Sequence, residues 1–277
     1  MSEISELTSA DKEFLQQYLP PPRPEDTLKE RRRGLPFVTL TYASSLDGMI
    51  SLAPGLRTNL SGPETKSMTH YLRLHHEAIL VGVGTAIPDD PGLNSRYPGA
   101  TLEKQPQPVI IDPNRRWNVG DSKVLKLAQQ EQGHTPWIIT AKTARISPPT
   151  TEEVNGQNFE LRPLIGRTRV AASGDGETMP VEWLDWVDIL KHIKRMGINS
   201  VMIEGGATII STLLSLPHLV HSVIVTVAPT WLGEGGVAVS PAQKREEGER
   251  VNAARLEETA WRQFGADAVL CGRLLQE

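Results

Sequence analysis

The stretch that decides the fold is Val201-Met202-Ile203-Glu204-Gly205-Gly206-Ala207-Thr208. An apolar run typical of a buried strand ends on a carboxylate and passes through two glycines into a helix with apolar periodicity. Neither glycine carries a Cβ, so the backbone can approach a ligand closely, and the free N–H groups at the start of the helix favour a phosphate. Glu204 is then expected to contact another part of that ligand, a ribose or a substrate. For an isolated Gly-Gly pair, a turn that serves packing alone is the alternative.

A second glycine-rich junction, Val81-Gly82-Val83-Gly84-Thr85, follows another apolar run. Gly82 and Gly84 free the backbone, and Thr85 offers a hydroxyl and an N–H to a phosphate or an amide. Asp89 could accept ribose hydroxyls, or it could cap the turn. The junction lacks the third glycine of the G-x-G-x-x-G fingerprint. Two such junctions after buried strands of one sheet are expected at its carboxyl edge, where α/β proteins bind ligands, and together they indicate a dinucleotide site.

Polar residues near these junctions are candidates for binding a substrate. Asn94 and Arg96 follow the second junction. The planar guanidinium of an arginine suits a phosphate monoester, although a surface arginine near a turn is commonplace. Asp47 lies on the turn that follows the first strand, and it could bind a ligand or cap that turn. The sequence contains no G-x-S-x-G motif, no Walker loop and no Cys-His nucleophile pair. A pocket that can bind phosphate groups but contains few titratable side chains suits hydride transfer, in which a cofactor supplies the reactivity.

Composition argues against several other classes of protein. The 277 residues fit one large domain or two small ones, and the formal charge of −4 argues against nucleic acid or an anionic membrane as a partner. No apolar run approaches the roughly 18 residues that cross a bilayer. Cys271 is the single cysteine and the seven histidines show no metal-ligand spacing, so no metal is expected. The acidic N-terminus is unlike a secretory signal or transit peptide, so the expected location is the cytoplasm, with the nucleus not excluded.

Strand and helix patterns alternate along the chain after Pro36. They predict an α/β fold with a mostly parallel central sheet, antiparallel C-terminal strands and helices on both faces. The first 34 residues are expected to be a peripheral extension with one short helix that Pro20 ends, and 142–166 a loop or insertion. The expected strands are 37–43, 78–81, 109–111, 137–139, 168–172, 200–203, 220–228, 254–260 and 267–274, and the main expected helices are 63–75, 121–131, 184–196 and 207–215.

Three segments carry a resemblance to a known family. They are P-F-V-T-L-T-Y-A-S-S-L-D-G (36–48), L-R-L-H-H-E-A-I-L-V-G-V-G-T-A-I-P-D-D-P-G-L-N-S-R (72–96) and V-M-I-E-G-G-A-T (201–208). Their order and spacing resemble those of the riboflavin-biosynthesis reductases, whose fold is like that of dihydrofolate reductase. The resemblance runs from about residue 35 to the C-terminus. It implies a reductase domain at 35–277, preceded by an N-terminal extension at 1–34.

The resemblance implies an NADPH-dependent oxidoreductase that reduces a phosphoribosylamino-pyrimidinone to its ribitylamino counterpart, by hydride transfer to C1′ of the ring-opened imine. Glu204 and Asp47 are the expected catalytic residues, with Glu204 at the border of the cofactor and substrate sites. The resemblance also implies a homodimer, which is the usual form in this family. The implied cofactor contacts are Gly82, Gly84, Thr85, Asp89, Val181 (in the loop before the following helix), Glu204, Gly205, Gly206, Ala207 and Thr208, and the implied substrate contacts are Asp47, Asn94, Arg96 and Glu204.

Two departures from the bacterial pattern narrow this expectation. The zinc deaminase that commonly precedes the reductase in bacteria is absent, and Thr41 stands where bacterial members tend to carry a lysine. A mechanism that uses that lysine as a proton donor therefore does not carry over. The stand-alone form looks like the fungal type, whose substrate is 2,5-diamino-6-ribosylamino-4(3H)-pyrimidinone 5′-phosphate. The alternatives are a pteridine or dihydrofolate-type reductase of the same fold and a non-catalytic nucleotide-binding module.

Overall fold

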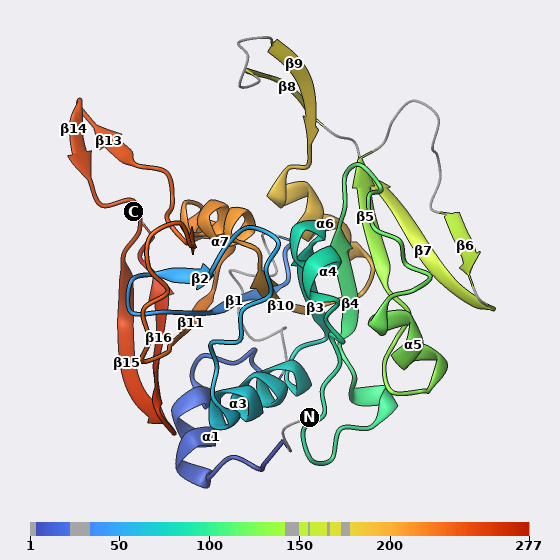
Figure 1. Cartoon of the computed structure of the whole chain (residues 1–277), viewed down its shortest axis with the longest axis horizontal. Coiled ribbons are helices and arrows are strands. Elements are labelled where there is room, and N and C mark those ends of the chain that lie inside the picture. The colour runs from blue at the N-terminus through green and yellow to red at the C-terminus, as the bar shows by residue number, and fades with distance from the viewer. Residues whose placement is uncertain are drawn as a thin grey trace.

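The computed structural model describes residues 4–22, 34–141, 150–154, 156–164, 167–172 and 178–276. A large sheet runs through this part of the chain (Figure 1). Its strands, in sheet order, are β15 (Leu256–Phe264), β16 (Asp267–Leu274), β11 (Ser222–Val227), β1 (Phe37–Ser44), β10 (Ser200–Gly205), β3 (Ala78–Gly82), β4 (Gln107–Ile111), β5 (Trp137–Ala141), β7 (Gln157–Leu164) and β6 (Thr150–Val154). Neighbours from β11 to β7 are parallel, whereas β16, β15 and β6 are antiparallel to their neighbours. This topology confirms the predicted fold class.

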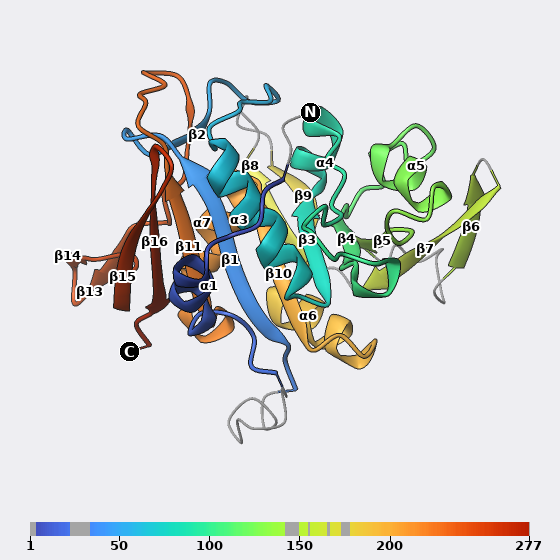
Figure 2. The ribbon, with the colours of Figure 1, turned by 90° about the horizontal axis from the view of Figure 1, so that it is seen from below.

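Helices cover both faces of the sheet, as predicted (Figure 2). Successive residues of β10 show the two layers, because Ile203 packs with α6 and α7, whereas Met202 packs with α1 and α3 on the other face. Strands buried on both faces are continuous apolar runs, which is why the sequence revealed them. The helices are α1 (Ser9–Gln16), α3 (Pro63–Leu74), α4 (Val83–Asp89), α5 (Lys123–Gln129), α6 (Trp186–Arg195) and α7 (Ala207–Leu214), with two short 3-10 turns, η2 (Leu102–Lys104) and η3 (Pro217–Leu219).

Smaller two-stranded sheets accompany the main sheet. They pair β2 (Met49–Ser51) with β12 (Val237–Ala238), β8 (Arg167–Ala172) with β9 (Thr178–Trp183), and β13 (Lys244–Glu246) with β14 (Glu249–Val251). The hairpins β8–β9 and β13–β14 extend away from the main sheet (Figure 1). The predicted strand at 168–172 is therefore present, but it belongs to a separate hairpin. Val181 lies on β9 and not in the predicted loop, and its side chain is outside the described part of the structure.

The prediction of a loop or insertion at 142–166 is wrong for much of that range. Residues 150–154 and 157–164 are β6 and β7, which extend the main sheet beyond β5. Phe159, Leu161 and Leu164 are buried, with exposed fractions of 4%, 2% and 8%. These apolar residues are separated by polar ones and by Pro163, so no continuous run marks the strand. Residues 142–149, 155, 165 and 166 lie outside the described residues.

The N-terminal segment packs into the hydrophobic core. Leu7, Leu15, Tyr18 and Leu19 are buried in a cluster with α3 and the C-terminal strands. The backbone N–H of Leu7 also donates to the hydroxyl of Tyr97 at 2.8 Å. The predicted short helix is present as α1, and its buried face makes the segment part of the folded unit. The domain boundary at residue 34 stays a prediction.

His76 links α3 to the central strand β1. Its Nδ1 lies 2.7 Å from the carbonyl oxygen of Leu72, and its Nε2 lies 2.7 Å from the hydroxyl of Thr39. A carbonyl can only accept, so Nδ1 carries the proton and Nε2 accepts from the threonine in the neutral ring. Burial lowers the pKa of His76 to about 4. The imidazole is therefore a neutral bridge in the core.

The free energy of unfolding should consequently depend on pH through His76. The folded-state pKa lies below the ordinary value of 6.5, so the unfolded chain binds the extra proton first as the pH falls. The contribution of His76 to the free energy of unfolding is fully present above pH 6.5 and is lost as the pH falls toward 4, at up to about 1.4 kcal/mol per pH unit. Urea denaturation at several pH values in this window should give a shallower slope for His76→Gln than for the wild type. Equal slopes would contradict a buried neutral imidazole.

Candidate active site

The two glycine junctions meet at one edge of the sheet. β3 and β10 are adjacent and parallel, so their carboxyl ends lie side by side. A Cβ added to Gly206 would stand 3.1 Å from Oγ1 of Thr85, and a Cβ added to Gly82 would stand 2.8 Å from Cδ1 of Ile209. Each junction thus contacts the helix that follows the other. The sequence predicted that both would lie at the carboxyl edge, and the structure brings them into contact.

The backbone at the β10 junction requires glycine. Gly205 has φ of +138° and Gly206 has φ of +69°, both in regions that L side chains rarely adopt. Gly206 is the N-cap of α7, and within the described residues no side chain caps α7 or α4. The first hydrogen bond of α7 runs from the N–H of Ile210 to the carbonyl of Gly206. The N–H groups of Ala207 and Thr208 therefore have no acceptor within the helix, and such groups at a helix start are suited to bind an anion.

Glu204 forms a two-pronged ion pair with Arg73. The register between β10 and β3 shifts between Ile203 and Gly205, so Glu204 occupies an irregular position at the strand end. Nε of Arg73 donates to Oε1 at 2.8 Å, and Nη2 donates to Oε2 at 2.6 Å. The side chains of Arg73 and Glu204 are only 12% and 16% exposed. Both carboxylate oxygens are thus engaged by one guanidinium on α3.

The loop that carries Asn94 and Arg96 is held by the same helix. Nη1 of Arg73 donates to the backbone oxygen of Asn94 at 2.9 Å, and the Asn94 side chain donates to the carbonyl of Gln132 at 2.9 Å. The N–H of Arg96 donates to Nδ1 of His70 at 3.0 Å. Burial, with the charges of Arg73 and Arg96, lowers the pKa of His70 to about 3. Glu204, Asn94 and Arg96 are therefore brought together around α3, as the predicted substrate site requires.

Asp47 is held in a separate network at the same sheet edge. Its carboxylate accepts hydrogen bonds from the hydroxyl of Ser45, from the N–H of Gly233 at 2.8 Å and from the N–H of Leu232 at 3.2 Å. The Ser45 hydroxyl, followed by the Gly233 N–H, lowers the pKa of Asp47. Asp47 thus joins the turn after β1 to the loop after β11. No described contact joins it to Glu204, Asn94 or Arg96.

The remaining predicted cofactor residues lie on the two helices. Asp89 is the last residue of α4 and is partly buried, and this burial raises the pKa of its carboxyl while the charge of Arg57 opposes the change. Gly84 is exposed on α4, and a Cβ there would meet open space. Ala207 is partly buried, whereas Thr208 is exposed. Thr208 also lines a cavity.

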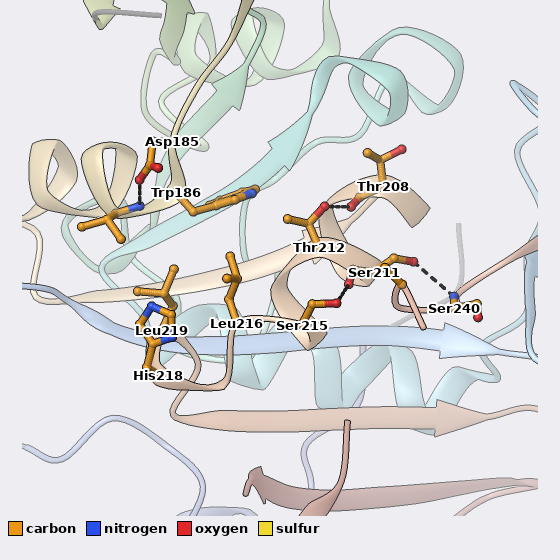
Figure 3. A pocket seen from close by; sticks show the side chains of 12 residues that line it. Asp185, Trp186, Thr208, Ser211, Thr212, Ser215, Leu216, His218, Leu219 and Ser240 are labelled. Atoms are coloured by element: carbon orange, nitrogen blue, oxygen red, sulfur yellow. Dashed lines mark hydrogen bonds between the residues drawn. The ribbon is translucent and has the colours of Figure 1, made fainter. Parts of the chain in front are cut away.

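This cavity, of about 730 Å³, lies beside α7 and the start of α6 (Figure 3). The indole of Trp186 and the side chains of Leu216 and Leu219 give it apolar walls, and serine and threonine hydroxyls of α7 line its other side. The Thr212 hydroxyl donates to the carbonyl of Thr208 at 2.7 Å. The full lining is Asp185, Trp186, Val187, Thr208, Ser211, Thr212, Ser215, Leu216, His218, Leu219, Ser240 and Ala242.

Sequence reasoning missed Arg73 and Trp186. Arg73 follows an apolar helix face in the last turn of α3, where a basic residue is expected merely to complement the helix dipole. Its partner Glu204 is 131 residues away, and no local pattern indicates that pair. Trp186 opens α6 and resembles an ordinary core residue of an amphipathic helix. Only the assembled fold shows that Arg73 pairs with Glu204 and that Trp186 lines the cavity.

The described residues contain no cluster of three or more His, Cys, Asp or Glu side chains that could hold a metal ion. In the same part of the chain, no helix is long and apolar enough to cross a membrane.

Gly206→Ala should weaken binding of a dinucleotide. The new methyl group would press on Thr85, and the alanine would have to adopt the φ of +69° that the fold requires at this position. We expect a cost of about 1–3 kcal/mol in stability. We expect the dissociation constant of NADPH, measured by calorimetric titration, to rise at least about tenfold.

Gly197→Ala is the matched control for this variant. Gly197 also has a positive φ, of +91°, with open space around it, and it lies just before β10, at the opposite edge of the sheet. Both variants should lose stability in urea, and only Gly206→Ala should lose affinity for NADPH. Unchanged affinity in Gly206→Ala would remove the junction from the cofactor site.

Comparisons with known proteins agree on one family. The model of the RibD C-terminal domain matches residues 36–270. The 2,5-diamino-6-ribosylamino-4(3H)-pyrimidinone 5′-phosphate reductase of Saccharomyces cerevisiae is 38% identical over 266 residues, which cover 96% of each chain. The reductase of the same name from Eremothecium gossypii is 38% identical, over 95% of each chain.

Solved structures agree with these sequence matches. The structure of the riboflavin-biosynthesis reductase Rib7 of Saccharomyces cerevisiae aligns with a TM-score of 0.70 and 34% identity, over 96% of this chain and all of that one. RibD of Acinetobacter baumannii aligns with a TM-score of 0.62 and 24% identity, over 88% of this chain and 59% of the other, and so supports the fold alone. The chain therefore belongs to the RibD C-terminal domain family of riboflavin-biosynthesis reductases.

Proposed function

We propose that this protein reduces 2,5-diamino-6-ribosylamino-4(3H)-pyrimidinone 5′-phosphate to its ribitylamino product, with NADPH as the reductant. The fungal relatives that match over almost their whole length are named for this substrate. The observation that carries the proposal is the contact between the two glycine junctions, beside the Arg73–Glu204 pair. Backbone groups at this contact suit a dinucleotide and the charged side chains beside it suit a sugar phosphate, which supports the proposal.

The residues of the junctions fit a nicotinamide dinucleotide, which is the cofactor type of a reductase in this family; NADPH is the form that we propose. When bound, it supplies the hydride. The N–H groups of Ala207 and Thr208 and the hydroxyl of Thr85 are suited to bind its pyrophosphate. Gly205 and Gly206 leave room for that approach, because neither carries a Cβ. Asp89 accepts ribose hydroxyls in this proposal.

The adenosine end of the cofactor is assigned to the cavity beside α7. Thr208 belongs both to the β10 junction and to the lining of the cavity, which supports the assignment of one extended ligand to both. The indole of Trp186 offers a flat apolar wall to a purine, and the α7 hydroxyls offer polar contacts. Val181 lies on β9, four residues before Asp185 in the cavity lining, which supports its assignment to this end of the cofactor.

The substrate is assigned to the side of the site that faces α3. Arg96 is exposed and contributes a guanidinium to the 5′-phosphate, for which its planar fork is suited. Asn94 fixes the loop that carries it, through its bond to Gln132. Glu204 orients the sugar, because it lies next to Gly205 at the end of β10. Asp47 is assigned to the substrate as well, as the family resemblance implies; the N–H groups of Leu232 and Gly233 hold its carboxylate at the end of β1.

The chemistry requires ring opening before reduction. The ribosylamine opens to an imine with a C1′=N bond, a hydride adds to C1′, and a proton adds to the nitrogen, which gives a secondary amine and leaves the oxidised cofactor. Both oxygens of Glu204 accept hydrogen bonds from Arg73, which favours an orienting role for this carboxylate. An imine nitrogen is basic enough to take its proton from solvent or from a nearby carboxyl group, so the step needs no strong acid.

We also expect a homodimer in the cytoplasm. Among the described strands, β8 pairs only with β9 and β13 pairs only with β14. Both hairpins extend away from the main sheet (Figure 1). An isolated two-stranded hairpin is marginally stable in water, which supports a second copy of the chain as the partner. Sedimentation equilibrium of the purified protein tests the predicted dimer.

Deuterium transfer tests the proposed reaction. The protein is incubated with NADPH deuterated at C4 of the nicotinamide, in separate preparations for the two faces, and with the diamino substrate. One preparation should place deuterium at C1′ of the ribityl product, as measured by NMR and mass spectrometry. The deaminated substrate and dihydrofolate are the comparison substrates, and we expect the diamino compound to be reduced fastest and dihydrofolate not at all. Binding of NADPH without reduction of any of them would favour a non-catalytic module.

Glu204→Gln tests the proposed role of the carboxylate. The change keeps the size of the side chain but removes the charge that pairs with Arg73, so the sugar should lose its fixed orientation, and we expect turnover of the diamino substrate to fall about a hundredfold. Glu258→Gln is the matched control, since Glu258 pairs with Arg273 at 2.7 Å on an exposed surface outside the site. A near wild-type rate in Glu204→Gln would remove Glu204 from the reaction.

A further inference from the structure

The N-terminal segment is bonded to the loop at 91–97. The backbone N–H of Leu7 donates to the hydroxyl of Tyr97 at 2.8 Å, across 90 residues of sequence. Leu7 and Tyr97 are 8% and 5% exposed, so water competes little for this bond. Just before it, the N–H of Ser5 donates to the hydroxyl of Ser67 on α3 at 3.0 Å. The segment therefore joins α3 to the loop.

Packing and hydrogen bonds fix the other parts of Tyr97. Its ring meets that of Tyr71 on α3 edge to face, with the centroids 5.2 Å apart, an arrangement that aromatic pairs prefer. Both rings belong to the buried cluster that contains Leu7. The N–H of Tyr97 donates to the hydroxyl of Ser95 at 3.2 Å. The hydroxyl of Tyr97 thus connects a well-packed ring to the N-terminal segment.

Arg96 lies between two residues that the fold holds in place, Ser95 and Tyr97. The N–H of Ser95 donates to Oε1 of Gln105 at 2.7 Å, and Nε2 of Gln105 donates to the carbonyl oxygen of Ser95 at 2.9 Å. The N–H of Arg96 donates to Nδ1 of His70 at 3.0 Å. Ser95 and Tyr97 are buried, whereas Arg96 is exposed. The position of its guanidinium therefore depends on this stretch of backbone.

The loop also contains a backbone conformation that needs support. Leu93 is fully buried and has φ of +54°, which is unfavourable for a leucine. Such a conformation persists only where surrounding contacts enforce it. The bond between Leu7 and Tyr97 is one contact that fixes the loop near this residue.

We propose that the N-terminal segment positions the substrate loop, because its bond to the Tyr97 hydroxyl holds the loop where Arg96 binds the 5′-phosphate. Tyr97 is thus a positioning residue that acts through Arg96, and the identity of the ligand rests on the proposed function. The cofactor junction, in contrast, consists of backbone groups at the ends of β3 and β10 and the start of α7, which the sheet holds. Loss of the Tyr97 hydroxyl should therefore weaken binding of the sugar phosphate and leave NADPH binding unchanged.

Tyr97→Phe tests the proposal, because it removes the hydroxyl and keeps the ring that packs on Tyr71. We expect the KM of the diamino substrate and the inhibition constant of ribose 5-phosphate each to rise about fivefold, the size expected for one buried neutral hydrogen bond. A phosphate contact remote from the reacting atoms contributes to binding alone, so kcat should change less than about twofold. The dissociation constant of NADPH should likewise change less than about twofold.

Tyr18→Phe is the matched control. Tyr18 belongs to the same N-terminal segment and is 2% exposed, and its hydroxyl donates to the carbonyl of Glu258 on β15 at 2.7 Å. Both variants should lower the melting temperature, but Tyr18→Phe should leave KM, kcat and the inhibition constant unchanged. Equal rises of KM in the two variants, or an unchanged KM in Tyr97→Phe, would overturn the proposal.

A double-mutant cycle with Arg96→Gln tests the route from Tyr97 to the substrate. Arg96→Gln alone should raise the KM, since the phosphate loses its guanidinium. Tyr97→Phe in the Arg96→Gln background should raise it no further, because the effect of the hydroxyl passes through Arg96. Additive increases would show that Tyr97 acts independently of Arg96, against the proposal.

Hydrogen exchange separates this proposal from the proposed function, because the measurement needs no substrate. In the free protein, amides at 91–97 should exchange about fivefold faster in Tyr97→Phe than in the wild type, whereas those of β3 and β10 should be unchanged. Failure of the wild type to reduce the diamino substrate would refute the proposed function alone. Unchanged exchange at 91–97 would refute the role of the N-terminal segment, whatever the substrate.

Discussion

β3 and β10 lie side by side, run parallel and both end in glycine, so the helices that follow them begin against each other. This contact, with Gly206 facing Thr85 and Gly82 facing Ile209, determines the rest of the site. It gathers the unpaired N–H groups of two helix starts at one point of the sheet edge. Side chains larger than glycine would fill that point or strain its backbone. The pyrophosphate part of the proposed dinucleotide site is therefore made largely from backbone groups, and it depends on the order of the strands.

The proposed substrate half of the site is built in a different way. It consists of charged and amide side chains on a loop and a helix, and Arg73 joins them to the end of β10 through Glu204. Removal of one partner from such a weakly exposed pair leaves the other charge without compensation, which is strongly destabilising. The two halves should thus respond differently to mutation. The cofactor half is sensitive to added volume, and the substrate half is sensitive to lost charge.

The sequence predicted the central architecture because parallel strands buried on both faces are uninterrupted apolar runs, as in β3 and β10. It also predicted both glycine junctions directly after such runs and the helix that follows the β10 junction, but it did not predict α4, the seven-residue helix that follows β3. It failed for β7, where polar residues and Pro163 interrupt the apolar pattern. It did not reveal how closely the N-terminal segment packs, nor the pairing of Arg73 with Glu204. Those contacts join residues far apart in the chain, and each partner is locally an ordinary residue at a helix end or a strand end.

The most direct test of the proposed cofactor site is a crystal structure of the protein with NADPH bound. We predict pyrophosphate oxygens within hydrogen-bond distance of the N–H groups of Ala207 or Thr208 and of the Thr85 hydroxyl. We also predict the adenine beside Trp186 and the nicotinamide on the side of Glu204. A dinucleotide bound without contact to Gly205, Gly206 or Thr208 would contradict the role of the glycine junctions.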